Sequence, residues 1–227
     1  MISRTGGRAR PLAYPLGVTV AALAVCAAVL PFGDTDQRAG AAAVALVVLG
    51  YSVIRLARAF GVLPHGLPDE VRNSPVPVRR VRQQHRLASR SWLEFGASGQ
   101  RGRWWLPVYF APELATLTEC GGLVDARQIE AGGLRMFPAG RARDTEPVGR
   151  LIDNPVRPAP DAEQRARTAN RLSRRLLLDA QPAVAAPIAA LLWVYLDGGG
   201  LGAFVGALGV AAAAAVWLTA IRGSDPS

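Results

Sequence analysis

Long apolar stretches alternate with polar ones along this chain, and four of the apolar stretches approach the length of a membrane span. A helix needs about 20 mostly apolar residues to cross a hydrocarbon core of roughly 30 Å. The pattern therefore predicts a membrane protein with four transmembrane helices. The expected spans cover residues 12–30, 41–60, 179–196 and 201–221.

The four expected spans group into two helical hairpins, an N-terminal one at residues 1–60 and a C-terminal one at residues 182–227. The third span reaches full length only if it takes in a turn from residues 176–181 or from the glycines after Asp197. A cleaved signal peptide is the alternative interpretation of the first span, but the small-residue cleavage site such a peptide needs is weak here. Near the end of the second span, Arg55 and Arg58 can extend their charged heads to the membrane interface, so anchoring is their expected role.

The polar insert at residues 61–181 contains a middle portion, 92–153, in which short apolar runs are separated by glycines. Short apolar runs between turn-forming residues are typical of β-strands in hairpins. The insert is expected to hold a small all-β module of barrel-like or sandwich-like form. Its predicted strands are 92–95, 103–110, 114–118, 123–127, 134–137 and 148–152.

The run 103–110 predicts a strand that lies at an edge or carries a bulge, because Pro107 cannot donate a hydrogen bond to a neighbouring strand. Alternation places Trp104, Leu106, Val108 and Phe110 on one face and Trp105 and Tyr109 on the other. We expect both faces to be covered by the module and its neighbours. A platform on which nucleic-acid bases stack is the alternative function of these aromatic side chains.

Two basic segments flank the predicted module. Residues 61–91 form a linker rich in proline and arginine, and residues 154–181 comprise a second linker followed by a basic amphipathic helix that starts near Asp161. Such a helix beside a span is expected to lie in the membrane interface, or alternatively in the groove of a partner protein. The arginines expected to contact anionic lipid are Arg79, Arg80, Arg82, Arg86, Arg165, Arg171, Arg174 and Arg175.

The distribution of arginine predicts the orientation in the membrane. All 26 cationic residues are arginines, and 19 of them lie in residues 61–181, whereas the link 32–40 has one and residues 197–200 have none. Arginine-rich segments stay on the cytoplasmic side. Both termini and the central module are therefore expected in the cytoplasm, with the protein in the plasma (inner) membrane of a bacterium. In a soluble protein a pI near 11 would instead suggest nucleic acid.

The sequence contains few elements of catalytic chemistry. It has no lysine for a phosphate-binding loop, no metal-ligand spacing, and two isolated cysteines, Cys26 and Cys120. No cofactor or metal is expected. The one speculative enzyme site consists of Asp144, Glu146 and Asp153, which lie among arginines and are more simply explained as surface ion pairs.

These features favour a non-enzymatic scaffold or accessory subunit whose β module is an interaction surface near anionic lipids. The expected partners are membrane lipids, and a second copy of the chain or another membrane protein. A membrane enzyme that acts on a lipid-linked substrate is the alternative. A membrane-tethered nucleic-acid binder is a third hypothesis, and nucleic acid is the least expected partner.

Overall fold

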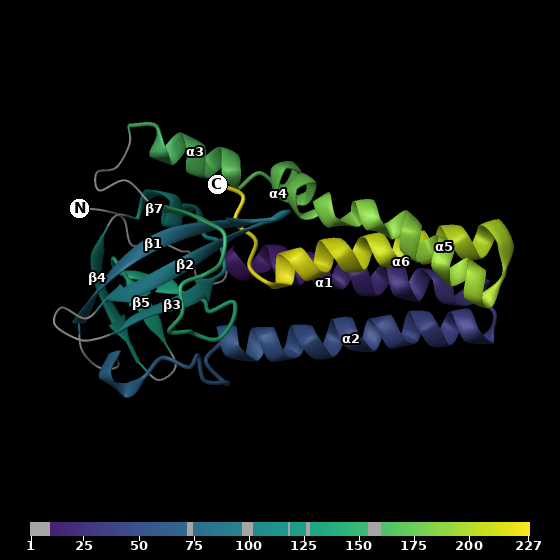
Figure 1. Cartoon of the computed structure of the whole chain (residues 1–227), viewed down its shortest axis with the longest axis horizontal. Coiled ribbons are helices and arrows are strands. Elements are labelled where there is room, and N and C mark those ends of the chain that lie inside the picture. The colour runs from purple at the N-terminus through teal and green to yellow at the C-terminus, as the bar shows by residue number, and fades with distance from the viewer. Residues whose placement is uncertain (1–9, 72–74, 97–101, 118, 126–127, 154–159) are drawn as a thin grey trace.

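The computed structural model describes residues 10–71, 75–96, 102–117, 119–125, 128–153 and 160–227. Figure 1 shows an elongated molecule with a helical bundle at one end and a β module at the other. The bundle is built from both ends of the chain, and the module is inserted between them. The predicted fold class, with two helical hairpins around an all-β insert, is confirmed.

Four helical segments are long and apolar enough to cross a membrane. α1 (Arg10–Val29) and α2 (Thr35–Ala59) form the first hairpin, joined by the short η1 (Leu30–Phe32). The third span, Leu172–Asp197, combines α4 (Leu172–Asp179), η4 (Gln181–Ala185) and α5 (Ala186–Asp197). α6 (Gly200–Ile221) is the fourth. The third span borrows residues before Pro182, as the sequence predicted, and it is two turns longer at that end than expected.

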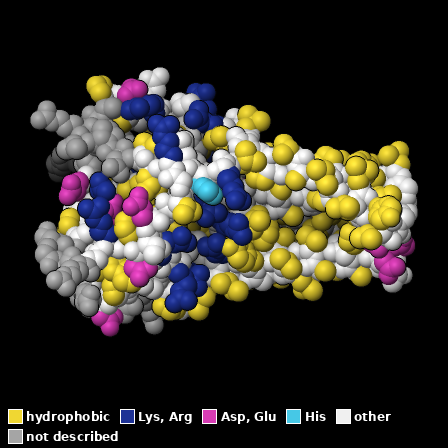
Figure 2. All heavy atoms as spheres, viewed as in Figure 1, with side chains coloured by type: hydrophobic (Ala, Val, Ile, Leu, Met, Phe, Trp, Pro, Cys, Tyr) yellow, Lys and Arg dark blue, Asp and Glu magenta, His cyan; other side chains and the backbone are white. Residues whose placement is uncertain are grey.

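The bundle has a narrow core and a wide apolar exterior. Tyr14, Val18 and Ala22 of α1 pack against Val48 of α2 and Trp217 of α6. Outward-facing side chains such as those on the middle of α2 are also apolar, and Figure 2 shows apolar groups over the whole length of the bundle. In water such a surface would be unfavourable, whereas in a lipid bilayer it is matched by the solvent.

A small polar contact joins three helices inside the bundle. Trp217 of α6 donates its indole N–H to the Ser52 hydroxyl of α2 at 2.9 Å, and the Ser52 and Thr19 hydroxyls lie 3.5 Å apart. Thr19 also donates to the Pro15 carbonyl of its own helix α1. Polar groups buried in a bundle need such partners, because lipid offers none. These bonds fix how α1, α2 and α6 are rotated relative to one another.

The β module is one antiparallel sheet that curls into a half-barrel. Its strands follow the order β3-β2-β1-β4-β5-β6, and β7 also pairs with β1. Its inner face encloses the module core, which includes Val78, Leu93, Leu106, Leu114 and Ile129. The strands are β1 (Pro75–His85), β2 (Ala88–Gly96), β3 (Arg103–Val108), β4 (Cys120–Val124), β5 (Ile129–Ala131), β6 (Leu134–Met136) and β7 (Arg150–Asp153).

The central strand of the sheet is β1, which pairs with β2 along most of its length, with β4 near its start and with β7 near its end. It lies within residues 61–91, for which the sequence predicted a linker. Pro75 and Pro77 suggested an irregular segment, yet both fit at the start of the strand. The 114–118 run also differs, since Pro112–Thr116 forms the 3-10 turn η3.

The 103–110 run forms a strand as predicted, but the strand ends at Val108. β3 is the last strand in the sheet order and is buried from Trp105 to Val108, although the 137–143 segment forms backbone hydrogen bonds along its outer side. Leu106 and Val108 point into the module core, whereas Tyr109 belongs to a separate cluster with Leu12 of α1 and Ala59 of α2. This second cluster joins the module to the bundle. Two short helical elements complete the module: η2 (Asp69–Val71) precedes β1 in the chain, and α3 (Ala162–Ala169) packs against η3.

Candidate functional site

The junction between module and bundle is rich in arginine. Figure 2 shows a band of basic side chains where the apolar bundle ends and the module begins, with few acidic groups among them. The apolar surface stops at this band, which places the arginines at the level where lipid headgroups would lie.

Within this band, five arginines converge on one cavity of about 480 Å³, called here the arginine pocket. They come from four separate parts of the chain: α2, β2, the segment 139–145 and the residue that follows α6. The five are Arg55, Arg90, Arg141, Arg143 and Arg222. Trp92, Pro107, Gly140 and Thr145 line other parts of the pocket.

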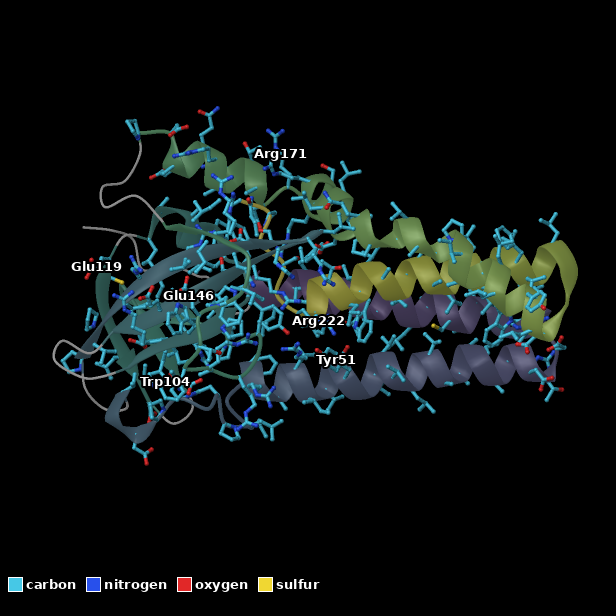
Figure 3. The ribbon with its side chains drawn as sticks, in the orientation of Figure 1. Tyr51, Trp104, Glu119, Glu146, Arg171 and Arg222 are labelled. Atoms are coloured by element: carbon cyan, nitrogen blue, oxygen red, sulfur yellow. The ribbon has the colours of Figure 1, made fainter. Side chains whose placement is uncertain are left out.

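Arg55 is held in place by its neighbours. Its guanidinium donates to the carbonyl of Ala139 and to the hydroxyl of Tyr51, one turn earlier on α2. The Nε of Arg222 donates to the same Tyr51 hydroxyl at 3.4 Å. Figure 3 shows Arg222 and Tyr51 close together at the junction. A Cβ at Gly140 would lie 3.0 Å from an Arg55 nitrogen, so glycine there leaves space for the guanidinium.

Arg90 and Arg143 form the wall on the module side. Arg143 lies over the Trp92 ring, with 4.9 Å between its Cζ and the ring centroid. Burial lowers the pKa of Arg90, and the positive charges of Arg222 and Arg55 lower it further. The charged form of Arg90 is thus less favoured here than in water, because it is both desolvated and surrounded by like charges.

The five arginines have no acidic counterpart within the described part of the chain: none of them forms an ion pair there, and no carboxylate lines the pocket. The guanidinium groups of Arg90, Arg141 and Arg143 also lack a hydrogen bond to any described residue. Other arginines of the module do have carboxylate partners, as Arg79 and Arg103 share Glu94. A concentration of positive charge without compensation is suited to hold an anion.

A second polar cluster lies where the C-terminal segment 222–227 crosses the sheet. Asp225 pairs with Arg80, and it accepts a hydrogen bond from Ser91 at 2.6 Å. The backbone N–H of Asp225 donates to the backbone carbonyl of Ser89, and Ser224 forms an isolated antiparallel β-bridge with Arg90. These contacts attach the end of α6 to β1 and β2.

The same segment also contacts the third span. Asp179 of α4 accepts hydrogen bonds from Tyr14 of α1 at 2.7 Å and from Ser224 at 2.9 Å. Arg175, one turn earlier, lies 3.9 Å from the Tyr14 ring centroid. The cluster thus ties two spans to the C-terminal segment through buried polar groups. Tyr14, Asp179 and Ser224 bond to one another, whereas the buried Nε of Arg175 has no hydrogen-bond partner and its guanidinium packs on the rings of Tyr14 and Phe110.

The arginines predicted to contact lipid fall into two groups. Arg86, Arg165, Arg171 and Arg174 are exposed, and Arg79 and Arg82 are half-buried. Arg80 and Arg175 are in the interior, at 3% and 6% exposure. Arg80 forms an ion pair with Asp225, and Arg175 packs on the aromatic rings of Tyr14 and Phe110. Both arginines therefore contact protein groups instead of a lipid surface.

Asp144 and Glu146 of the speculative enzyme site do not line the arginine pocket. Asp144 and Glu146 are exposed, and neither forms an ion pair within the described residues. The backbone of Asp153 ends β7, opposite Val81, and its side chain lies outside the description. Burial raises the pKa of the Cys120 thiol, which leaves it less nucleophilic. Among described residues no group of three potential metal ligands occurs.

Sequence reasoning did not identify the arginine pocket. It assigned Arg55 to anchoring, treated Arg141 and Arg143 as members of surface ion pairs, placed Arg90 in the basic linker 61–91, and used Arg222 only for the orientation. A usable signal was present, because Arg55 and Arg222 both end apolar spans and so must lie near the same membrane surface. Nothing in the spacing along the chain, however, places Arg90 and the 139–145 segment beside them.

These observations define the class to which the protein belongs. By length and composition its four apolar helices are membrane spans, so the chain is a multi-pass membrane protein with an inserted antiparallel half-barrel. No family model matches it, and neither a curated protein nor a solved structure is detectably similar to it.

Proposed function

We propose that this protein is a non-enzymatic membrane scaffold that binds anionic lipid at the cytoplasmic face through the arginine pocket. The β module then serves as an interaction surface held close to the bilayer, for a second copy of the chain or another membrane protein. The observation that carries this proposal is the convergence, at the end of the spans, of five arginines that have no carboxylate partner among the described residues.

The position of the pocket favours lipid as the ligand. Arg55 lies within the last turns of α2, and Arg222 directly follows α6. A pocket built from two span ends is level with the lipid headgroups. Anionic headgroups attract basic groups near the surface by about 1 kcal/mol per charge.

The proposed orientation can be tested by cysteine labelling of intact cells. Phe32, between the first two spans, and Val148, on the module, are both exposed and suit single-cysteine variants in which Cys26 and Cys120 are replaced. A membrane-impermeant reagent should label Phe32→Cys from outside and Val148→Cys only after the cells are opened. The reverse pattern would contradict a cytoplasmic module.

The proposed role can be tested by native mass spectrometry of protein purified in mild detergent. We expect co-purified anionic lipid, together with a dimer or a stoichiometric protein partner. Replacement of Arg143, which is exposed in the pocket wall, by glutamine should reduce the retained lipid. The matched control, Arg103→Gln, removes an exposed arginine on β3 that lies outside the pocket, and it should leave the lipid in place. Protein free of both lipid and partner would speak against the proposal.

A further inference from the structure

We infer that the arginine pocket is a site for a phosphate group with two or more negative charges, that is, a phosphomonoester or a diphosphate. This inference rests on the proposed function and narrows its ligand. The chemistry is shared by a lipid headgroup and by a soluble phosphate, and the experiment below distinguishes the two sources.

The number of charges in the pocket is the first argument. Five guanidinium groups line it, and the described residues supply no carboxylate to offset them. A lipid phosphodiester has a single negative charge and would leave most of this charge uncompensated. A phosphomonoester has a charge of about −1.5 to −2 at pH 7, and a diphosphate group has a similar or larger charge.

The directions from which the arginines approach are the second argument. Arg55 and Arg222 come from the ends of α2 and α6, Arg90 from β2, and Arg141 and Arg143 from the segment 139–145. Guanidinium groups bind phosphate oxygens in pairs of parallel hydrogen bonds. A terminal phosphate presents three oxygens, so it can be bonded from several sides at once, whereas a phosphodiester has only two unesterified oxygens.

The size and lining of the pocket are the third argument. A volume of about 480 Å³ is in the range of small-molecule sites. Its aromatic side chain, Trp92, is 1% exposed and is covered by Arg143. It therefore offers no open ring on which a nucleotide base could stack. The remaining lining groups are small or polar, which suits a phosphate rather than a base or an acyl chain.

The state of Arg90 agrees with these arguments. Its lowered pKa reflects a cation that is desolvated beside like charges, and a bound dianion would relieve that repulsion. A ligand that binds only the folded protein raises its thermal stability. Ligand binding should therefore be visible as an increase in Tm.

The test uses the full chain in nanodiscs of phosphatidylcholine, with Tm as the readout. The probes are phosphatidic acid, a lipid phosphomonoester; phosphatidylglycerol, a lipid phosphodiester; and soluble pyrophosphate. The variants are Arg90→Gln and, in case that one does not fold, Arg143→Gln. Arg103→Gln on β3 is the matched control, since it removes one exposed positive charge outside the pocket.

We expect phosphatidic acid to raise Tm at a lower mole fraction than phosphatidylglycerol does. In either pocket variant the half-maximal amount of phosphatidic acid should rise about tenfold, the effect of losing one or two charge-assisted hydrogen bonds. The control should respond as the unmodified protein does. A rise in Tm with pyrophosphate would support a soluble source of the phosphate, and a response to phosphatidic acid alone would support a lipid source.

Three outcomes would overturn the inference, and the first of them would leave the proposed function intact. Equal responses to the two lipids would leave general anionic-lipid binding intact and exclude selectivity for a doubly charged phosphate. A full response to phosphatidic acid in Arg90→Gln or Arg143→Gln would exclude the pocket as its site. Failure of all three probes to raise Tm would count against both the inference and the proposed lipid binding.

Discussion

Arg80 and Asp225 form an ion pair that is almost wholly buried, although 145 positions separate them in the chain. Arg80 lies in the central strand of the module, and Asp225 lies beyond the last span. Ser91 and Ser227 donate further hydrogen bonds to the same carboxylate group. The pair therefore fastens the module to the end of the bundle, and it does so beside the arginine pocket, where Arg222 precedes Asp225 by three residues.

Replacing Asp225 by alanine should destabilise the junction strongly. Removal of one partner from a buried ion pair costs about 3 kcal/mol or more, because a charge stays in the interior without its compensation. Chemical unfolding of the purified protein, followed by the fluorescence of its tryptophans, would measure this loss. The control Glu163→Gln breaks an exposed pair with Arg167 and should cost less than about 0.5 kcal/mol. Similar losses in the two variants would contradict the structural role of Asp225.

The contribution of Asp225 should depend on pH in a defined direction. Burial by itself raises the pKa of this carboxyl group, but the charge of Arg80 and the hydrogen bonds from Ser91 and Ser227 outweigh it, so the pKa lies below its usual value. A lowered pKa means that the stabilisation is complete above the unfolded value of about 3.9 and is lost as the pH falls further. The gap in unfolding free energy between the unmodified protein and Asp225→Ala should be constant near neutral pH and shrink below about pH 4. A gap that grows on acidification would refute this assignment.

Gly223 should be intolerant of substitution. Its φ of +82° is in the left-handed region, and a Cβ there would lie 2.6 Å from the Cβ of Ala139. Gly223→Ala should therefore cost about 1–3 kcal/mol from backbone strain and shift segment 222–227 away from the sheet. Limited proteolysis at the C-terminus would detect this shift. Gly17→Ala is the control, because it has no neighbour within 4 Å and should be neutral or slightly stabilising in α1.

Gly40 should be needed for the approach of α5 to α2. A Cβ at this position would lie 2.0 Å from the Trp193 ring, which occupies the space left by the glycine. Gly40→Ala should lower Tm by several degrees, since the indole must move out of its packed position. Gly50→Ala, on the same helix with open space beside it, should leave Tm unchanged or raise it. A smaller effect at position 40 than at position 50 would show that the two helices are not packed as described.

The spans and the edge strand followed from the sequence for simple physical reasons. A bilayer requires long apolar helices, and a proline without an N–H fits best at a sheet edge. β1 did not follow, because the prolines and arginines of 75–85 lack the alternation that usually identifies a strand. Three neighbouring strands supply the hydrogen bonds that stabilise it, and these partners come from later parts of the chain.

The sequence by itself determined that apolar and basic residues are segregated, and with that the four spans, the all-β insert and the side of the membrane on which we propose that the insert lies. Only the tertiary structure decided which arginines face one another. Arg80 and Arg175 looked like surface charges and are buried against partners, whereas Arg55, Arg90 and Arg222 were unremarkable and meet in one pocket. The reason is that the number of charges in each segment can be counted along the chain. Whether a charge has an opposite charge beside it depends on distances in space, which only long-range packing sets.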